Sequence, residues 1–177
     1  HADIVQMSCA NSAEDVIELI DHLERLDATH LGVVLKIETR AGFENLPKML
    51  LAGMRLPRVR GIRARGELPV ATGFERYAEI HEEMLCLCEA AHVPVIWATQ
   101  VLESLAKKGA PARSEITDAA MSVRAECVML NKGPYILKAV TTLNDVLRRM
   151  REHRAKKRDL LRSLQVAGRQ DATGALS

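Results

Sequence analysis

The stretch Leu35-Lys36-Ile37-Glu38-Thr39 decides how this chain folds, because it ends an apolar run with two charged side chains. The run before it, Leu31-Gly32-Val33-Val34, is typical of a buried parallel strand. A buried strand holds a lysine and a glutamate only if something partners them, and at the carboxyl end of a βα unit that partner is often a ligand or a metal ion. Residues two apart on a strand share a face, so we expect Lys36 and Glu38 to project together. The pattern leaves open whether they bind a ligand or simply pair with neighbours.

Strand and helix patterns alternate along the whole chain. The expected strands are Asp3–Ser8, Gly32–Glu38, Gly61–Arg65, Val93–Thr99 and Cys127–Leu130. The expected helices are one capped by Asn11 or Ser12, one capped by Thr39 and ending near Gly53, then Phe74–Ala91, Gln100–Lys107, Ser114–Ala125 with Ser114 as its cap, and a last helix opened by Pro134. Five βα units with short links predict an α/β fold with a parallel sheet and right-handed crossovers. Five units are too few to close an eight-stranded barrel, so the sheet is either open and doubly wound or the larger part of a barrel.

Composition narrows the class of protein. With 177 residues, 47% apolar and 27% charged, the chain fits one globular domain, and its formal charge of +2 favours no particular partner. Aromatic residues are only 3%, too few for base-stacking platforms, and no apolar run is long enough for a membrane span. We expect the four cysteines to be reduced packing residues, which with the lack of a leader predicts a cytoplasmic protein. The start at His1, almost inside a strand, suggests a chain cut from something longer.

Polar residues also follow the other predicted strands. They are Arg65-Gly66-Glu67 after the third strand, Thr99-Gln100 after the fourth and Asn131-Lys132-Gly133 after the fifth. In parallel βα architecture these points converge at one rim. Glu38 and Glu67 could share a magnesium ion, which prefers oxygen ligands. Gly66 precedes a helix, where free N–H groups favour a phosphate or carboxylate, while Lys36 would stabilise negative charge and Thr99 could relay a proton.

Four blocks of this sequence resemble the pyruvate kinase family. They are Leu35-Lys36-Ile37-Glu38-Thr39, Ala64-Arg65-Gly66-Glu67-Leu68, Ala98-Thr99-Gln100-Val101-Leu102-Glu103-Ser104 and Pro111-Ala112-Arg113-Ser114-Glu115. In order and spacing they are similar to the second half of that family's barrel, over roughly residues 1–150. The resemblance implies parallel βα repeats that form roughly strands four to eight of a TIM-type (β/α)8 barrel.

The resemblance also implies roles for individual residues. Lys36 is similar to the family's lysine beside the transferred phosphoryl group, and Thr99 to its threonine near the enolpyruvate carbon. Glu38 and Glu67 are similar to its divalent-metal ligands, and Gly66 with Glu67 to its substrate-binding backbone. The implied reaction moves a phosphoryl group from phosphoenolpyruvate to ADP in glycolysis, giving pyruvate and ATP. The implied cofactors are Mg²⁺ or Mn²⁺, with K⁺ in the complete protein, and the implied assembly is a homo-oligomer.

The sequence departs from the family's pattern at several points. Glu67 stands where aspartate is usual, Pro69 where glycine is usual, and Arg63 where the strand is usually apolar. We also expect the first three strands, the lid domain and the nucleotide- and potassium-binding residues to be missing, so this chain alone should not be a competent kinase. Three interpretations stay open: a pyruvate-kinase-type phosphotransferase, which we favour; a magnesium-dependent lyase or aldolase acting on a pyruvate enolate; and a non-catalytic relative.

The chain divides into three parts by this interpretation. Residues 1–147 are the partial barrel, 148–165 a basic helical extension, and 166–177 a disordered tail. Eight Lys or Arg lie between Arg148 and Arg162, without interleaved aromatic residues, so we expect a solvated helix face that binds neither nucleic acid nor membrane. His81 falls on the apolar stripe of its helix, where a hydrogen-bonded core residue is a better interpretation than a metal ligand.

Overall fold

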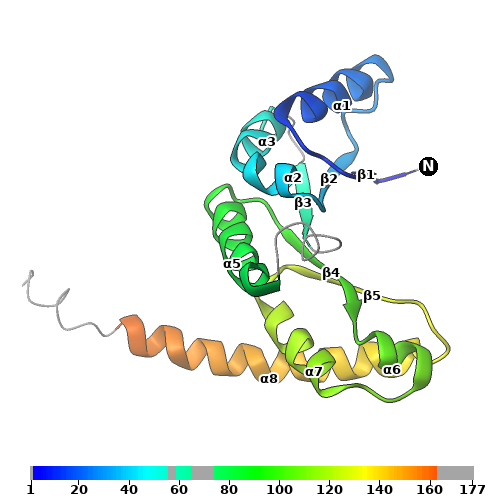
Figure 1. The fold of residues 1–177 in the computed structure, drawn as a ribbon, viewed down its shortest axis with the longest axis vertical. Helices are drawn as coiled ribbons and strands as arrows, with labels where there is room; N and C mark the ends of the chain where they lie inside the picture. The colour runs from blue at the N-terminus through cyan, green and yellow to red at the C-terminus, as the bar shows by residue number, and fades with distance from the viewer. Residues whose placement is uncertain (1, 56–58, 65–73, 163–177) are drawn as a thin grey trace, which may run out of the picture.

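The computed structural model describes the backbone of residues 2–55, 59–64 and 74–162. Its elements, in chain order, are β1 (Ile4–Met7), α1 (Ala13–Arg25), β2 (Gly32–Ile37), α2 (Arg40–Glu44), α3 (Leu46–Gly53), β3 (Val59–Ala64), α5 (Phe74–Ala90), β4 (Val95–Val101), α6 (Glu103–Lys108), α7 (Arg113–Met121), the 3-10 helix η1 (Ser122–Arg124), β5 (Cys127–Leu130) and α8 (Ile136–Arg162). Figure 1 shows α1, α2 and α3 grouped beside β1–β3, and α6, α7 and α8 grouped near β4 and β5.

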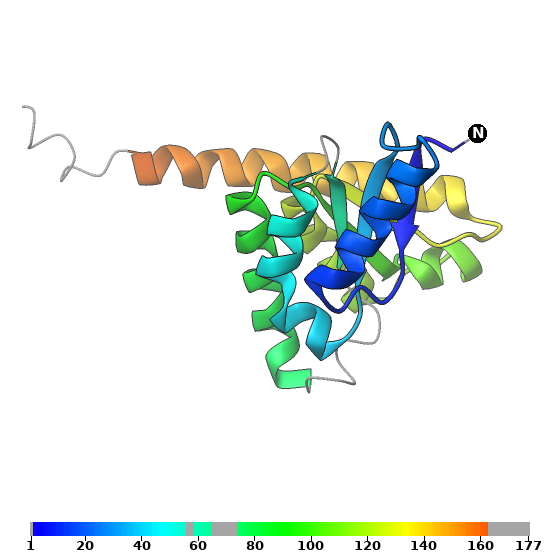
Figure 2. The same cartoon turned by 90° about the horizontal axis from the view of Figure 1, so that it is seen from above.

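The sheet confirms the expected α/β fold class. Its five strands run parallel in the order β1-β2-β3-β4-β5, so each βα unit adds a strand beside the previous one. The five described strands form an open sheet and no closed barrel, with β1 and β5 at its edges. In Figure 2, α1, α3 and α5 stand side by side along one side of the strands. This arrangement fits part of a TIM-type barrel, in which helices cover the outside of a parallel sheet.

Strand β2 separates the core from the polar rim. Val33, Leu35 and Ile37 are buried and belong to the main apolar core, which also contains buried side chains of α1 and α3. Because side chains alternate along a strand, Lys36 falls on the face opposite Leu35 and Ile37. The strand therefore packs one face into the main core and brings Lys36 to the other face, where Val34 is buried as well.

Several helix boundaries differ from the expectation. The helix expected between Thr39 and Gly53 is broken at Asn45, where α2 ends and α3 begins with Pro47 in its first turn. Proline lacks an N–H and is tolerated in a first turn, but it clashes inside a continuous helix. The helix expected from Gln100 begins only at Glu103, because β4 continues to Val101 and Leu102 has a left-handed φ of 50°.

The predicted cap of α7 at Ser114 is wrong. The N-cap is Ala112, and the Glu115 carboxylate accepts hydrogen bonds from the backbone N–H of Ala112 at 3.1 Å and of Ser104 at 2.6 Å. An acidic residue at the third helical position satisfies the free N–H groups even when the cap itself has no polar side chain. Glu115 thereby joins α7 to the first turn of α6.

The four cysteines are free thiols, as expected, but only Cys88 is a packing residue. Its side chain is completely buried, and burial, with a further contribution from Glu126, raises the pKa of the thiol to about 12. Cys9, Cys86 and Cys127 are exposed. His81 is buried, as expected, with its ring 5.1 Å from that of Trp97.

Helix α8 begins against the rest of the fold and then leaves it. Ala139 and Leu143 are buried, and Figure 1 shows the second half of the helix extending past the other elements. Among the described residues, no helix is both long and apolar enough to cross a membrane. The expected tail, 166–177, lies outside the described residues, and the division at residue 148 stays a prediction.

Candidate functional site

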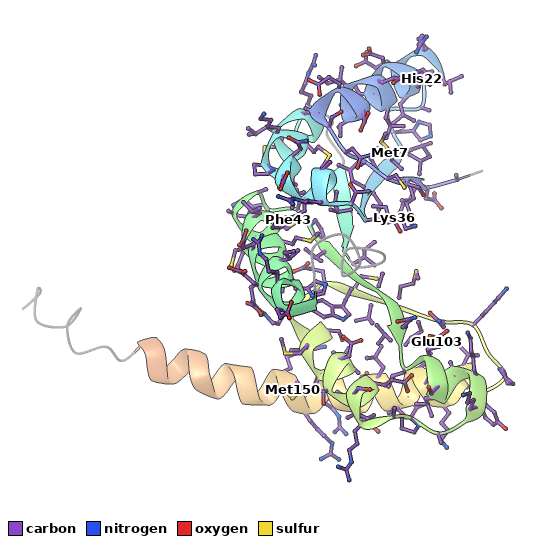
Figure 3. The ribbon with its side chains drawn as sticks, viewed as in Figure 1. Met7, His22, Lys36, Phe43, Glu103 and Met150 are labelled. Carbon is purple, nitrogen blue, oxygen red and sulfur yellow. The ribbon has the colours of Figure 1, made fainter. Side chains whose placement is uncertain are left out.

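The charged pair at the carboxyl end of β2 projects together, as the alternation predicts. Lys36 Nζ lies 2.5 Å from Glu38 Oε1, and the two side chains are 20% and 13% exposed. Figure 3 labels Lys36 at this end of the strand. Because both side chains are partly exposed to solvent, either charge can exchange its partner for a ligand without first being removed from a fully buried site. The pair could hold a cation through Glu38 and an anion through Lys36.

Cys9 approaches the same carboxylate from the end of β1. Its thiol donates to Glu38 Oε2 at 3.6 Å, so both oxygens of the carboxylate have a partner. Cys9 follows β1 with a left-handed φ of 52°, a conformation that is uncommon for a residue with a side chain. No sequence pattern indicates this contact, because it depends on the turn that the backbone makes after Met7.

Asn11 joins the loops that follow β1 and β2. Its side-chain amide donates to the Cys9 carbonyl at 2.9 Å and accepts from the Thr39 hydroxyl. Its backbone carbonyl accepts from the side-chain amide of Asn45 at 2.9 Å. In the sequence, Asn11 could be identified only as an alternative helix cap, since two of its partners, Thr39 and Asn45, are 28 and 34 residues away.

Two helix caps fix these loops in place. Ser12 caps α1 by accepting from the Asp15 N–H at 3.2 Å, and Asp15 accepts in return from the N–H groups of Asn11 and Ser12 at 2.9 Å each. The bond from Asn11 is the largest influence on the Asp15 carboxyl and, with those from Ser12, holds its pKa below the usual value against the effect of burial. Thr39 caps α2, as expected, by accepting from the Gly42 N–H at 3.0 Å.

The other predicted site residues are only partly placed. Thr99 lies in β4, but its side chain is outside the described part of the structure, and Gly66 and Glu67 fall in the undescribed segment 65–73. The sheet register pairs Ile37 with Ala64, and Ala64 with Trp97. The last residues of β2 and β3, Ile37 and Ala64, therefore lie beside each other at the carboxyl end of the strands, where Lys36 and Glu38 also lie.

A cavity lies at the opposite end of the strands. It has a volume of about 790 Å³ and is lined by residues of α5, η1 and α8 and of the segments that lead into β4 and β5, among them Cys88, His92, Arg124, Glu126 and Arg151. Val95 and Cys127, which also line it, are the first residues of their strands. Lys36 and Glu38, the predicted site residues whose side chains the structure describes, do not line this cavity, so it is separate from the charged pair.

The described residues contain no group of three or more His, Cys, Asp or Glu that could hold a metal ion. At the rim they provide Glu38, whose carboxylate oxygens suit Mg²⁺ or Mn²⁺, and Cys9 beside it. The donor set fits a magnesium ion that keeps several water molecules and uses only one or two protein carboxylates.

Comparison with known proteins gives one consistent result. The family model described as pyruvate kinase, barrel domain, matches residues 1–140. The chain is 32% identical over 165 residues to the pyruvate kinase of Geobacillus stearothermophilus, covering 90% of this chain and 27% of the relative. It is 33% identical over 152 residues to plastidial pyruvate kinase 3 of Arabidopsis thaliana, covering 81% and 25%, and 30% identical over 172 residues to the pyruvate kinase of Bacillus licheniformis, covering 93% and 28%. The chain therefore spans about a quarter of the length of these relatives.

Proposed function

The chain belongs to the pyruvate kinase family, and we propose that it supplies the metal- and substrate-binding half of a pyruvate-kinase-like phosphotransferase. The observation that best supports this is the Lys36–Glu38 pair, partly open to solvent at the carboxyl end of β2. In barrels of parallel βα units the chemistry takes place at this end of the strands. The reaction would transfer the phosphoryl group of phosphoenolpyruvate to ADP, giving ATP, and the enolate left behind would take up a proton to become pyruvate.

Charge balance explains why this pair suits phosphoryl transfer. Catalysis of this kind depends on positioning and on stabilising the negative charge of the phosphoryl oxygens. A divalent cation on Glu38 would compete with Lys36 for the carboxylate and leave the ammonium available to a phosphoryl oxygen. The ion pair would thus be the resting form of the site. Glu67 as a second metal ligand, Gly66 and Glu67 as substrate-binding backbone, and Thr99 near the enolate carbon complete the proposal. Mg²⁺ or Mn²⁺ supplies Lewis-acid stabilisation of the phosphoryl charge when bound.

Manganese titration followed by electron paramagnetic resonance tests the metal site directly. The chain is expected to bind Mn²⁺, and Glu38→Gln is expected to weaken that affinity by at least tenfold, because the amide lacks the charge. Glu44→Gln is the matched control, since Glu44 pairs with Arg40 at 2.7 Å on nearby α2 and is more than half exposed. Absence of binding by the unchanged chain, or equal affinities for the unchanged chain and Glu38→Gln, would contradict the proposal.

Two other interpretations of the same family membership make different predictions. A magnesium-dependent lyase or aldolase would act on a pyruvate enolate without nucleotide, so ADP-dependent formation of pyruvate in a complete barrel separates it from a kinase. A non-catalytic relative is favoured by Glu67 and Pro69, which stand where the family usually has aspartate and glycine. That relative would bind neither Mn²⁺ nor phosphoenolpyruvate at the rim. A cytoplasmic location, K⁺ dependence and homo-oligomeric assembly are further parts of the proposal, as is the inactivity of this chain by itself.

A further inference from the structure

We propose that Asn11 is a positioning residue that fixes the Glu38 carboxylate for metal binding, a role that rests on the proposed function of Glu38. Neither the sequence patterns nor the family resemblance assigns Asn11 to the site. Its side chain connects the loop after β1 with the loop after β2, which carry Cys9 and Thr39 respectively. The inference therefore concerns a residue that holds the site in shape without contacting the ion.

The contacts form a closed ring. Cys9 donates its thiol to Glu38 Oε2, and the Cys9 carbonyl accepts from the Asn11 side-chain N–H. The Asn11 side-chain oxygen accepts from the Thr39 hydroxyl, and Thr39 is bonded in the chain to Glu38. Glu38 is thus held at its side chain by Cys9 and at its backbone by the neighbouring residue Thr39, so it loses much of its freedom to turn away from a bound ion. Rigid support of this kind is what outer partners give to metal ligands.

The two partners at this point of the ring suit an asparagine. The side chain faces a carbonyl, which only accepts, and a hydroxyl, which donates here because Asn11 offers an oxygen. An amide supplies one donor and one acceptor at the right separation. Aspartate would place a carboxylate oxygen against the Cys9 carbonyl and so lose that bond, while alanine would lose both bonds.

The backbone of Asn11 holds the ring to the fold. Its N–H donates to Asp15 on α1, and its carbonyl accepts from Asn45, which lies between α2 and α3. The left-handed turn at Cys9 is uncommon for a residue with a side chain, so surrounding contacts have to hold it. Loss of the Asn11 bond to Cys9 should therefore release both that turn and the thiol contact to Glu38.

Mn²⁺ affinity and thermal unfolding, measured on the same variants of the 177-residue chain, test this role. Asn11→Ala and Asn11→Asp are each expected to weaken Mn²⁺ binding about tenfold, the lower end of the effect of removing an outer partner of a metal ligand. Ser12→Ala is the matched control: it removes a helix-cap bond in the same loop, outside the ring, and should lower the melting temperature while changing Mn²⁺ affinity less than twofold.

A second pair of variants tests the ring from its other side. Thr39→Val removes the hydroxyl that Asn11 accepts from and should weaken Mn²⁺ binding, whereas Thr39→Ser keeps the hydroxyl and should preserve the affinity. Folded Asn11 variants that bind Mn²⁺ as tightly as the unchanged chain would overturn the inference.

A second readout separates failure of the ring from failure of the metal site. Iodoacetamide labelling, resolved by peptide, reports how freely the Cys9 thiol moves, and exposed Cys86 and Cys127 serve as internal references. Asn11→Ala is expected to raise the labelling rate at Cys9 several-fold and to leave the two references unchanged. If the unchanged chain binds no Mn²⁺ but Cys9 responds in this way, the ring exists and the proposed metal function is wrong. Unchanged Cys9 labelling in Asn11→Ala would contradict the ring itself, whatever the metal result.

Discussion

At the scale of single residues, the competition between a metal ion and Lys36 for Glu38 controls what the rim can bind. The ammonium lies 2.5 Å from the carboxylate, so a cation must displace or share it. Lys36→Met is therefore expected to tighten Mn²⁺ binding several-fold, although it removes the group that would stabilise the phosphoryl charge. Lys48→Met, an exposed lysine of nearby α3, is the control and should leave the affinity unchanged. Weaker Mn²⁺ binding by Lys36→Met would show that the lysine supports the ion rather than competing with it.

Gly42 gives a test of how closely the two rim loops pack. A Cβ at this position would lie 2.5 Å from the backbone carbonyl oxygen of Ala10, a separation that requires the loops to move apart. Gly→Ala in a helix ordinarily stabilises by about 0.5–1 kcal/mol. Here we expect Gly42→Ala to destabilise by about 1–3 kcal/mol, the usual cost of overpacking, in urea unfolding followed by circular dichroism. The exposed neighbour Ala41 serves as the control, since Ala41→Ser should change stability by less than about 0.5 kcal/mol. An increase in stability for Gly42→Ala would contradict the close packing of the Ala10 carbonyl oxygen against Gly42.

The residues that could be predicted from sequence are those whose placement is local. Strand alternation is enough to bring Lys36 and Glu38 to one face, and Thr39 follows directly as a helix cap. Cys9 and Asn11 reach the site through a left-handed turn and through contacts between loops. No periodic pattern reports such contacts, because they arise only once β1 and β2 are paired.

At the scale of elements, Glu115 links two helices and makes their junction sensitive to acid. Burial alone would raise the pKa of Glu115, but hydrogen bonds from the backbone N–H groups of Ser104 and Ala112 outweigh it and leave the pKa below its usual value. A carboxyl whose pKa is lower in the folded chain contributes stability above its unfolded pKa, about 4.5, and loses it as the pH falls through the folded value.

Glu115→Gln is therefore expected to be less stable than the unchanged chain at pH 7, with the difference shrinking as the pH falls below about 4.5. Urea unfolding at a series of pH values measures it. Glu103→Gln is the control, because it affects only the ion pair with Lys107 on α6 and should cost less than about 1 kcal/mol. A stability difference for Glu115→Gln that stays constant from pH 7 to pH 3 would contradict the assignment.

The existence of the elements was more predictable than their ends. All five strands overlap the ranges expected from the sequence, and β2 shows the continuous apolar run that a buried parallel strand leaves. The ends depend on single contacts: the break at Asn45 comes with Pro47 in the next first turn, and the start of α7 depends on the Glu115 carboxylate reaching back to Ala112. Glu115 could have indicated an N-cap three residues before it, at Ala112, but Ser114 beside it is the more usual type of N-cap residue.

At the scale of the whole molecule, the sheet is open and its two edge strands are β1 and β5. Among the described strands, each of these two has a neighbour on one side only, and Ile4 on β1 is 51% exposed. Exposed parallel edges favour association with another chain. Near the sheet, α8 also exposes Leu137 at 80% and Val140 at 49%. The number of strands could be predicted from the sequence. Whether the sheet remains open could not, because that depends on contacts at its edge strands.

We expect the purified 177-residue chain to be poorly stable or to self-associate. Pairing between copies at β1 or β5 would recover backbone hydrogen bonds and part of the missing apolar burial. Static light scattering over a range of concentrations, combined with thermal unfolding, measures both properties. A monodisperse monomer that melts cooperatively would contradict this expectation, because it would show that the open sheet completes its own core.

The central claim is that the carboxyl end of β2 is the metal- and substrate-binding rim of a pyruvate-kinase-like barrel. Anomalous diffraction from crystals of the chain grown with Mn²⁺ tests it most directly, because the signal locates the ion without reference to activity. The account predicts one strong peak at coordination distance from the Glu38 carboxylate, with Lys36 displaced from its 2.5 Å contact. A peak elsewhere, for example in the cavity at the opposite end of the strands, with none beside Glu38, would contradict it.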